Sequence, residues 1–339
     1  MTHRFPIKEI ARQSGLGAAT VDRVLNNRSH VSPQTRNRVE AAIEELVQQE
    51  QQLAARGRRL FVDIVVEAPE RFTAEIRQAA EAVLPSIGFG IFRPRFLFQE
   101  IMSDADIETI LARIAKRGSH GVCLKARDIP VVRQMVDRLT SLGIPVVTLA
   151  TDIPGTARTA YVGVDNANAG RTAAYLMASA AKSEKGVVLA TRSQEEFYGE
   201  IERYTCFCET LAELMPGFEV LNIAGGAGLA SATTNRLTGV LEDVEDLTAI
   251  YSVGGGNDAI VRLLAEYGYA DLIYVAHDLD RDNRKLIEAG AISFVLHHDL
   301  KTDMRNLFLA IAAAHRLAPP TKPKLVSDVQ VITPFNLPV

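Results

Sequence analysis

From residue 61 onward, short runs rich in Val and Ile alternate with longer amphipathic stretches. This alternation is typical of βαβ units, whose strands form a parallel sheet covered by helices on both faces. It favours an α/β body of two doubly wound lobes, the first ending near Thr151 and the second beginning near Gly170. A ligand would then bind in the crevice at the carboxyl ends of the strands. The predicted strands are residues 61–66, 89–92, 121–124, 145–149, 186–190, 219–223, 249–253, 273–276 and 293–296.

The first 47 residues follow an all-helical pattern instead. Apolar residues recur at helical spacing from Ile7, and a Gly-Leu-Gly turn at 15–17 precedes a second stripe at 20–25. A third helix is expected to begin at Ser32, a good N-cap, with Pro33 at the first helical position. The segment therefore predicts three short helices.

Residues 48–60 are rich in Gln and then in Arg, and they lack a strong apolar face. This composition favours a linker, or a helix that forms only when docked. We therefore expect a helical module at 1–47, a hinge at 48–60 and a two-lobed domain at 61–339.

The charge is distributed unevenly along the chain. Residues 1–60 hold ten Lys/Arg and six Asp/Glu, a net charge of +4; since the whole chain carries -4, the remainder carries -8. A basic end on an acidic body suits a head that faces phosphates, although a solvated charged surface would have the same composition.

The cysteines Cys123, Cys206 and Cys208 are too few for a disulfide framework and lack metal-ligand spacing. No secretory leader and no membrane-spanning run is evident in the sequence. We therefore expect a cytoplasmic protein that does not associate with membranes.

The predicted helices form a helix-turn-helix, in which the second helix enters the DNA major groove. Its first residues, Ala18 and Ala19, offer methyl contacts, so Arg23 and Asp22 must supply polar contacts to bases. Asp22 could instead pair with Arg23. The expected phosphate contacts, which set the register rather than the sequence, include Thr20, Asn26 and His30.

The stretch from Ile7 to Leu46, IKEIARQSGLGAATVDRVLNNRSHVSPQTRNRVEAAIEEL, closely resembles the headpiece of the lactose-repressor (LacI) family. Residues 20–26 match that family's T-V-S-R-V-L-N run except at Asp22, where the family usually has Ser. Gly17 also stands where the family usually has a Ser N-cap. The base preference of the family therefore cannot be transferred to this chain. The helical pattern alone would also fit a three-helix protein-interaction module, but the resemblance favours a DNA-binding headpiece.

In the LacI family the third helix is followed by a hinge helix, which inserts a leucine into the minor groove. The usual Tyr, Pro and Asn are absent here, where residues 47–52 read VQQEQQ. Residues 53–56, LAAR, look like the hinge, but an ungapped alignment puts Gly57 at the wedge position. Leu53 is the candidate wedge.

The rest of the chain resembles the effector domain of the same family, which is similar to periplasmic sugar-binding proteins. A polyhydroxylated ligand needs bidentate polar partners and an aromatic face. The candidate effector-binding residues are Phe72, Asp152, Arg203, Asn257, Asp278 and His298.

Several of these candidates have structural alternatives. Phe72 could belong to the core, Arg203 could form an ion pair within its helix, and Asp278 could pair with Arg281 or Arg284. His297 is an equal candidate to His298, because adjacent residues at a strand end point to opposite faces.

No catalytic pair, nucleotide loop, metal cluster or cofactor motif is recognisable in the sequence. We therefore expect a regulator rather than an enzyme, with no cofactor. The resemblance implies a transcriptional regulator, expected to be a repressor, that binds a palindromic operator as a homodimer and responds to a sugar or polyol. Whether the effector releases or promotes DNA binding is open. A sugar-utilising enzyme and a transport binding protein are the rival interpretations.

Overall fold

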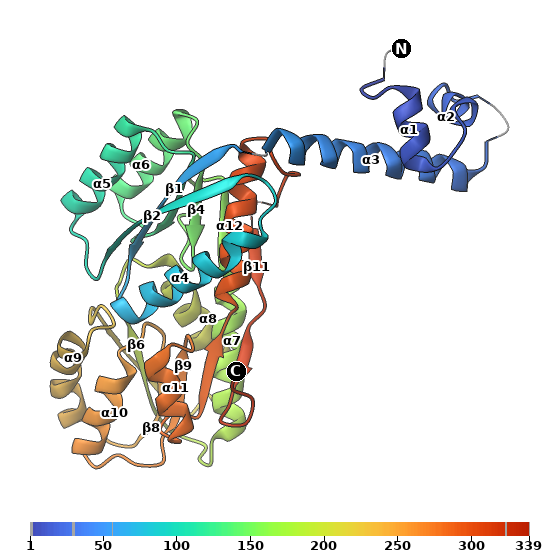
Figure 1. The fold of residues 1–339 in the computed structure, drawn as a ribbon. Helices are drawn as coiled ribbons and strands as arrows, with labels where there is room; N and C mark the ends of the chain where they lie inside the picture. The colour runs from blue at the N-terminus through green and yellow to red at the C-terminus, as the bar shows by residue number, and fades with distance from the viewer. Residues whose placement is uncertain (1–2, 29–30, 56, 323, 339) are drawn as a thin grey trace.

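The computed structural model describes residues 3–28, 31–55, 57–322 and 324–338, without the side chains of residues 48 and 51–55. A small helical headpiece sits at the far end of a long helix that projects from a two-lobed body (Figure 1). The headpiece consists of α1 (Ile7–Ser14), α2 (Ala18–Leu25) and the first part of α3 (Pro33–Ala55). The three predicted helices are therefore present.

The headpiece has a core of its own, separate from those of the body. Each helix contributes the apolar residues that its periodicity marks, and Gly15 ends α1 in the left-handed conformation at φ 63°. This φ suits glycine, which has no Cβ to clash with the backbone. The buried members of this core are Phe5, Ile10, Val21, Val24, Val39 and Leu46.

The third helix does not end near residue 47, where the headpiece was expected to stop. It continues to Ala55, through the segment expected to form a hinge. Gln, Glu, Leu and Ala, which dominate this segment, are strong helix formers, and a break comes only near Gly57, whose φ is 84°. An exposed ion pair between Arg4 and Glu50 (2.7 Å) links the extension to the start of the headpiece.

Lobe 1 is built on a six-stranded parallel sheet in the order β11-β5-β4-β3-β1-β2. One face is covered by α4 and α12 and the other by α5 and α6. Its strands are β1 (Arg59–Glu67), β2 (Ile91–Gln99), β3 (Gly121–Lys125), β4 (Val146–Leu149), β5 (Ala160–Val164) and β11 (Lys324–Ser327). Its helices are α4 (Glu70–Val83), the 3-10 turn η1 (Leu84–Ser86), α5 (Asp104–Arg117), α6 (Pro130–Ser141) and α12 (Leu300–Ala314).

Lobe 2 repeats this plan with the sheet order β12-β10-β9-β8-β6-β7, in which only β12 pairs antiparallel among the described strands. Helices α7 and α8 pack on one face and α9 to α11 on the other. Its strands are β6 (Gly186–Arg192), β7 (Phe218–Ala224), β8 (Leu247–Ser252), β9 (Ile273–His277), β10 (Phe294–His297) and β12 (Gln330–Ile332). Its helices are α7 (Asn166–Ala180), α8 (Tyr198–Leu214), α9 (Ala230–Asp243), α10 (Asn257–Glu266) and α11 (Arg281–Glu288).

The α/β prediction of two doubly wound lobes is confirmed, but the boundary between the lobes is not where the sequence placed it. Lobe 1 does not end near Thr151, because β5 belongs to its sheet, and α12 and β11 return to it later. Strands β5, β11 and β12 were not predicted. The chain therefore crosses between the lobes after β5, after β10 and again after β11.

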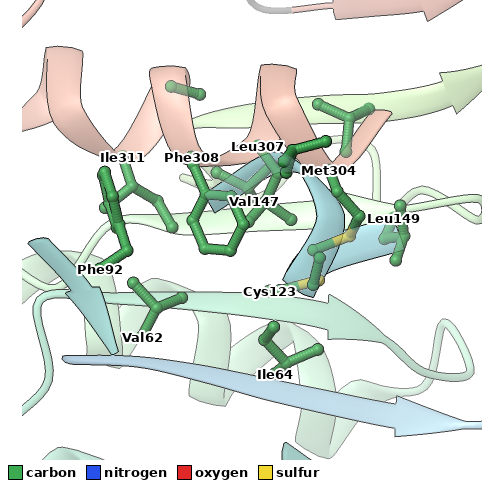
Figure 2. Packing of buried hydrophobic residues seen from close by; sticks show 14 of the residues in the cluster. Val62, Ile64, Phe92, Cys123, Val147, Leu149, Met304, Leu307, Phe308 and Ile311 are labelled. Atoms are coloured by element: carbon green, nitrogen blue, oxygen red, sulfur yellow. The ribbon is translucent and has the colours of Figure 1, made fainter. Parts of the chain in front are cut away.

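Helix α12 shows how a late segment completes an early lobe. Its apolar residues, among them Met304, Leu307 and Phe308, lie against strands of the lobe 1 sheet (Figure 2). The rings of Phe308 and Phe92 lie 4.9 Å apart between centroids. Lobe 1 therefore cannot complete its core without the C-terminal part of the chain. In the described part of the chain, none of the helices is long and apolar enough to span a bilayer.

Candidate functional site

Helix α2 lies on the side of the headpiece that is away from the two-lobed body (Figure 1). Val21 and Val24 anchor it in the headpiece core, while Ala18, Ala19 and Arg23 on the other side are exposed. The Arg23 side chain makes no hydrogen bond or ion pair with the described residues. Two methyl groups and one free guanidinium thus face solvent.

The carboxylate of Asp22 is held by residues other than Arg23. Asn26 donates to its Oδ1 (2.8 Å), and Arg28 lies 3.3 Å from its Oδ2. The alternative pairing of Asp22 with Arg23 is therefore not present, and Arg23 is left available. Thr20, on the same helix, is half-buried.

His30 lies outside the described residues. Leu53, the candidate wedge, lies on α3, but its side chain is likewise outside the described part.

The second site is a cleft between the lobes, where strands of both sheets end. Its walls include residues at or just after the last residues of β1, β3, β6 and β9, such as Glu67, Lys125, Ser193 and Asp278. The carboxyl ends of parallel strands meet at one edge of each sheet, and the two edges face each other across the cleft. The structure therefore has a cleft at the location expected for a ligand.

Three of the predicted effector residues line this cleft: Phe72, Arg203 and Asp278. Phe72 also belongs to the lobe 1 core, as the structural alternative proposed. The Arg203 guanidinium forms no ion pair within its helix; it donates to Asn166 Oδ1 (2.6 Å) and to the carbonyl of Val253 (3.2 Å).

Asp278 is paired with a histidine rather than with Arg281 or Arg284. Its Oδ1 lies 3.4 Å from Nε2 of His298, whose Nδ1 lies 2.5 Å from Oδ2 of Asp303 on α12. Burial alone would lower the pKa of His298, but the two carboxylates raise it to about 10. His298 is therefore an imidazolium at neutral pH, and it sits behind Asp278 rather than in the cleft wall.

The charge of His298 acts back on Asp278. Burial alone would raise the pKa of Asp278, but the imidazolium holds it well below its usual range. The backbone of Asp278 adopts φ 65°, a conformation that side chains other than Asn and Asp rarely accept. The cleft thus contains a carboxylate that remains ionised and is held in a strained turn.

The other two predicted effector residues lie away from the cleft wall. Asp152 is buried and forms an ion pair with Arg158 (2.5 Å) next to the cleft-lining Thr151. Asn257 is also buried, with its amide bonded to Asn283 (2.7 Å) and to the hydroxyl of Tyr274 (2.9 Å). The polar groups of both residues are used to hold loops in place.

His297 is also occupied, because its Nδ1 accepts from the backbone N–H of Leu279 (3.2 Å). Among the described residues, no group of His, Cys, Asp and Glu is arranged to hold a metal ion.

Sequence reasoning missed Lys125, which directly follows the predicted strand at 121–124. Its ammonium lies 3.9 Å from the ring centroid of Phe197 and 5.8 Å from that of Phe72, and it donates to the carbonyl of Glu67 (3.1 Å). Burial lowers the pKa of Lys125, while Glu200 and Glu67 oppose that shift. The position after a strand end was the available signal.

Glu200 and Arg71 were missed for a different reason. Glu200 accepts from the backbone N–H (2.7 Å) and hydroxyl (2.5 Å) of Ser193, which closes the loop after β6. Arg71 pairs with Asp280 (2.8 Å) and donates to the carbonyl of Gly228 (2.8 Å), both of which belong to lobe 2. Their roles depend on residues brought close only by the tertiary fold.

The lobes are closed on each other along this cleft. Besides the contacts of Arg71, the backbone N–H of Asp128 donates to the carbonyl of Glu196 (2.8 Å), and that of Gly199 donates to Thr151 Oγ1 (3.0 Å). Each of these bonds joins lobe 1 to lobe 2. The two lobes are therefore in direct contact beside the cleft.

Comparison with known proteins gives a separate assignment to each part of the chain. Residues 6–47 match the family described as bacterial regulatory proteins, lacI family, and residues 70–315 match the periplasmic binding protein domain. The HTH-type transcriptional regulator TreR of Salmonella typhimurium is 60% identical over 43 residues, which is 13% of this chain and 14% of TreR. The chain thus matches only about a seventh of that curated relative, and the likeness is confined to one segment.

The body resembles solved sugar-binding proteins in fold. GanP, a glucose-galactose binding protein from Geobacillus stearothermophilus, superposes with a TM-score of 0.73 at 17% identity, over 84% of this chain and 99% of GanP. A solute binding protein of an ABC transporter from Burkholderia graminis, in complex with D-arabinose, gives a TM-score of 0.73 at 20% identity, over 81% of this chain and 95% of that protein.

The matched headpiece family consists of regulatory proteins, in agreement with the expectation that the chain is not an enzyme. The periplasmic binding protein domain covers most of the remaining chain. The chain therefore belongs to the family of the periplasmic binding protein domain, and it carries in front of that domain a headpiece that matches the lacI family of bacterial regulatory proteins.

Proposed function

We propose that the protein regulates transcription by placing α2 in the major groove of an operator. The observation that carries this proposal is the exposed edge of α2, where Ala18, Ala19 and Arg23 face solvent while the opposite face is packed into the headpiece. An Arg can bind the O6 and N7 acceptors of guanine with two hydrogen bonds, and alanine methyl groups suit the thymine methyl. Asp22 is hydrogen-bonded to Asn26 and paired with Arg28. Its main role would then be to orient the end of the helix, and not to contact a base.

A single headpiece of this size buries too little surface for specific affinity. Two headpieces on one homodimer would read two half-sites separated by whole turns of the duplex, and a palindromic operator mirrors that symmetry. We therefore propose a homodimer acting on DNA in the cytoplasm, most simply as a repressor.

The cleft is proposed to take a small polyhydroxylated molecule such as a sugar or polyol. Asp278 offers an ionised acceptor, Lys125 offers a donor, and the rings of Phe72 and Phe197 offer an apolar face for C–H groups. This mixture of a few fixed polar groups and aromatic surface suits a neutral polar ligand. Two proteins of similar fold support this proposal. GanP is described as a glucose-galactose binding protein, and the solute binding protein from Burkholderia graminis was solved with D-arabinose.

The connection between the two sites runs through β1. Its first residue, Arg59, lies close after α3, and its last residue, Glu67, lines the cleft. A ligand that shifts the closure of the lobes would therefore shift the orientation of α3 and the spacing of two headpieces in a dimer. Neither site needs to touch the other.

The proposal is tested by selecting bound duplexes from a random library and measuring their affinity with and without each member of a panel of pentoses, hexoses and polyols. A thermal-shift screen of the same panel identifies the ligand, because a cleft ligand at a hundredfold excess over its Kd adds about 2.7 kcal/mol to the free energy of unfolding. Enrichment of a palindromic sequence is expected. Recovery of no preferred sequence would refute the DNA-binding proposal, and a silent panel would refute the sugar proposal alone.

A further inference from the structure

A second hollow lies at the amino end of the lobe 1 sheet, opposite the effector cleft and beside the connection from α3 to β1. Phe61, Arg95, Arg117, Ser119 and His120 line it. We infer that this hollow binds a phosphate-type oxyanion. Binding of free phosphate does not depend on the proposed function, whereas binding of a DNA backbone phosphate rests on it, and separate experiments test the two.

The two arginines of the hollow share one carboxylate. Nη2 of Arg95 lies 2.7 Å from Oδ2 of Asp63, and Nη2 of Arg117 lies 2.6 Å from Oδ1 of the same residue. Asp63 is fully buried at 0% exposure, so its carboxylate interacts with the two arginines and has no contact with solvent. One negative charge against two positive charges leaves the cluster with a net charge of +1.

Within the described ranges of the chain, several N–H groups of these arginines have no hydrogen-bond acceptor. Nε of Arg95 is buried and has no hydrogen-bond partner among the described residues. The side chains of Arg95 and Arg117 are 31% and 43% exposed, so a small ion can reach the exposed parts of both guanidinium side chains, though not the buried Nε of Arg95 without a local shift. The Arg95 guanidinium also lies 5.4 Å from the ring centroid of Phe61, which helps to fix its orientation.

His120 adds a further donor. Its Nδ1 accepts from the backbone N–H of Phe61 (3.1 Å), so the proton of the neutral ring is on Nε2. Burial lowers the pKa of His120, and the neighbouring charges of His315, Arg95 and Arg58 lower it further. The ring is therefore neutral at pH 7 and supplies an N–H.

The hollow thus combines free donors with a net positive charge, and its carboxylate is already bound on both oxygens. A tetrahedral oxyanion, with several acceptor oxygens and one or two negative charges, has the complementary chemistry. Two sources carry such a group: free inorganic phosphate and the backbone of DNA held by the headpiece. The exposed Arg58 and Arg59 beside the hollow attract either one.

The test variant is Arg117→Gln, which removes one cation but leaves Asp63 paired with Arg95. The matched control is Arg113→Gln, which removes the same charge from the exposed surface of α5 one turn earlier. Full-length proteins are titrated with inorganic phosphate by calorimetry at constant ionic strength. Wild type and Arg113→Gln should bind phosphate. The affinity of Arg117→Gln for phosphate should be lower by a factor of about ten or more.

A second readout reports position in the hollow. Phosphate binding should raise the pKa of His120, followed by NMR, in the wild type and in Arg113→Gln, but not in Arg117→Gln. The titratable and charged side chains around His120 are His315 after α12, Arg95 on β2, Arg117 on α5 and Arg58 before β1. Absence of phosphate binding to the wild type, or equal binding by Arg117→Gln, would overturn the inference.

A DNA arm separates the two sources. Duplex binding is measured in chloride buffers of increasing concentration for all three proteins. If the hollow takes a backbone phosphate, the slope of log K against log salt should fall by about one for Arg117→Gln relative to Arg113→Gln. An equal slope, together with lost phosphate binding, identifies the free anion as the ligand.

Discussion

Nε of Arg71, on α4 of lobe 1, lies 2.8 Å from Oδ2 of Asp280 at the start of α11 in lobe 2. Both side chains are largely buried, at 17% and 6% exposure, and the same guanidinium donates to the carbonyl of Gly228. A charge pair of this kind, shielded from water, holds two bodies together more strongly than an exposed pair does. It therefore acts as a latch on the closed form of the cleft.

Replacing Arg71 by Gln should shift the body toward an open form even without a ligand. Hydrogen bonds to charged groups contribute about 1.5–3 kcal/mol each, so the open population should rise about tenfold or more. Small-angle X-ray scattering of the ligand-free protein should show a larger radius of gyration. The matched control is Arg262→Gln, which breaks an exposed ion pair with Asp258 on one helix and should leave the radius unchanged. Identical scattering from both variants would contradict the latch.

Replacing Arg23 by Ala should abolish the preference of the protein for its selected operator while leaving effector binding intact. Loss of a bidentate contact to a base lowers discrimination by about 1–3 kcal/mol per half-site. Gel-shift titrations on operator and on scrambled duplex measure this ratio. Arg12→Ala, an exposed change on α1, should alter both affinities by the same factor. Undiminished discrimination by Arg23→Ala would exclude α2 as the reading helix.

Replacing Gln52 by Pro should uncouple the two sites. Proline inside a helix removes a backbone hydrogen bond and costs about 3 kcal/mol or more, so α3 should break before β1 while the headpiece core stays folded. The effector-dependent change in operator affinity, typically about 1–3 kcal/mol for coupled sites, should then disappear. Gln52→Ala keeps the helix and should keep the coupling. Effector response retained in the proline variant would show that α3 does not transmit it.

Replacing His298 by Gln should destabilise the protein in a pH-dependent way. The variant leaves Asp278 and Asp303 facing each other without the imidazolium, and loss of one partner of a buried pair costs about 3–5 kcal/mol. Because the folded-state pKa of His298 is raised to about 10 from 6.5, its stabilising effect is complete below pH 6.5 and is lost as pH rises toward 10.

The free-energy difference between wild type and His298→Gln should therefore shrink between pH 7 and pH 9, by at most about 1.4 kcal/mol per pH unit. Urea unfolding at a series of pH values measures it. Because the pKa of Asp278 is lowered in the folded state, its contribution to the free energy of unfolding is present above the usual pKa range of a carboxyl group. That contribution is therefore constant between pH 7 and pH 9. His277 and His297, whose pKa values are lowered mainly by burial, are also neutral in it. A difference that does not vary with pH would show that His298 is uncharged.

Much of the headpiece could be predicted because its determinants are local. Apolar residues at helical spacing, such as Ile10, Val21 and Val39, identify the face of each helix that packs inward, and Ser32 with Pro33 identifies a helix start. The end of α3 was the exception. Weak amphipathicity suggested a linker, but the residues are good helix formers, and intrinsic propensity continued the helix.

The cleft could be predicted only in part. Phe72, Arg203 and Asp278 were found from the order of the strand ends and from the family resemblance, and they line the cleft. Asp152 and Asn257 were chosen by the same reasoning, yet their side chains are turned to local partners, Arg158 and Tyr274. A polar residue after a strand is near the cleft by topology, but its rotamer depends on neighbours that are distant in sequence.

The amino-acid sequence alone determined most of the local elements, although not β5, β11, β12 or the end of α3; it also determined that a basic three-helix head precedes an acidic α/β body, and to which family the head is similar. These properties follow from periodicity, capping and composition, which act over one or two turns of chain. The tertiary structure alone decided that α12 and β11 return to lobe 1, that His298 stands behind Asp278, and that Arg71 reaches Asp280. Each of these depends on contacts between residues far apart in the chain, and only the folded arrangement of both lobes brings them within bonding distance.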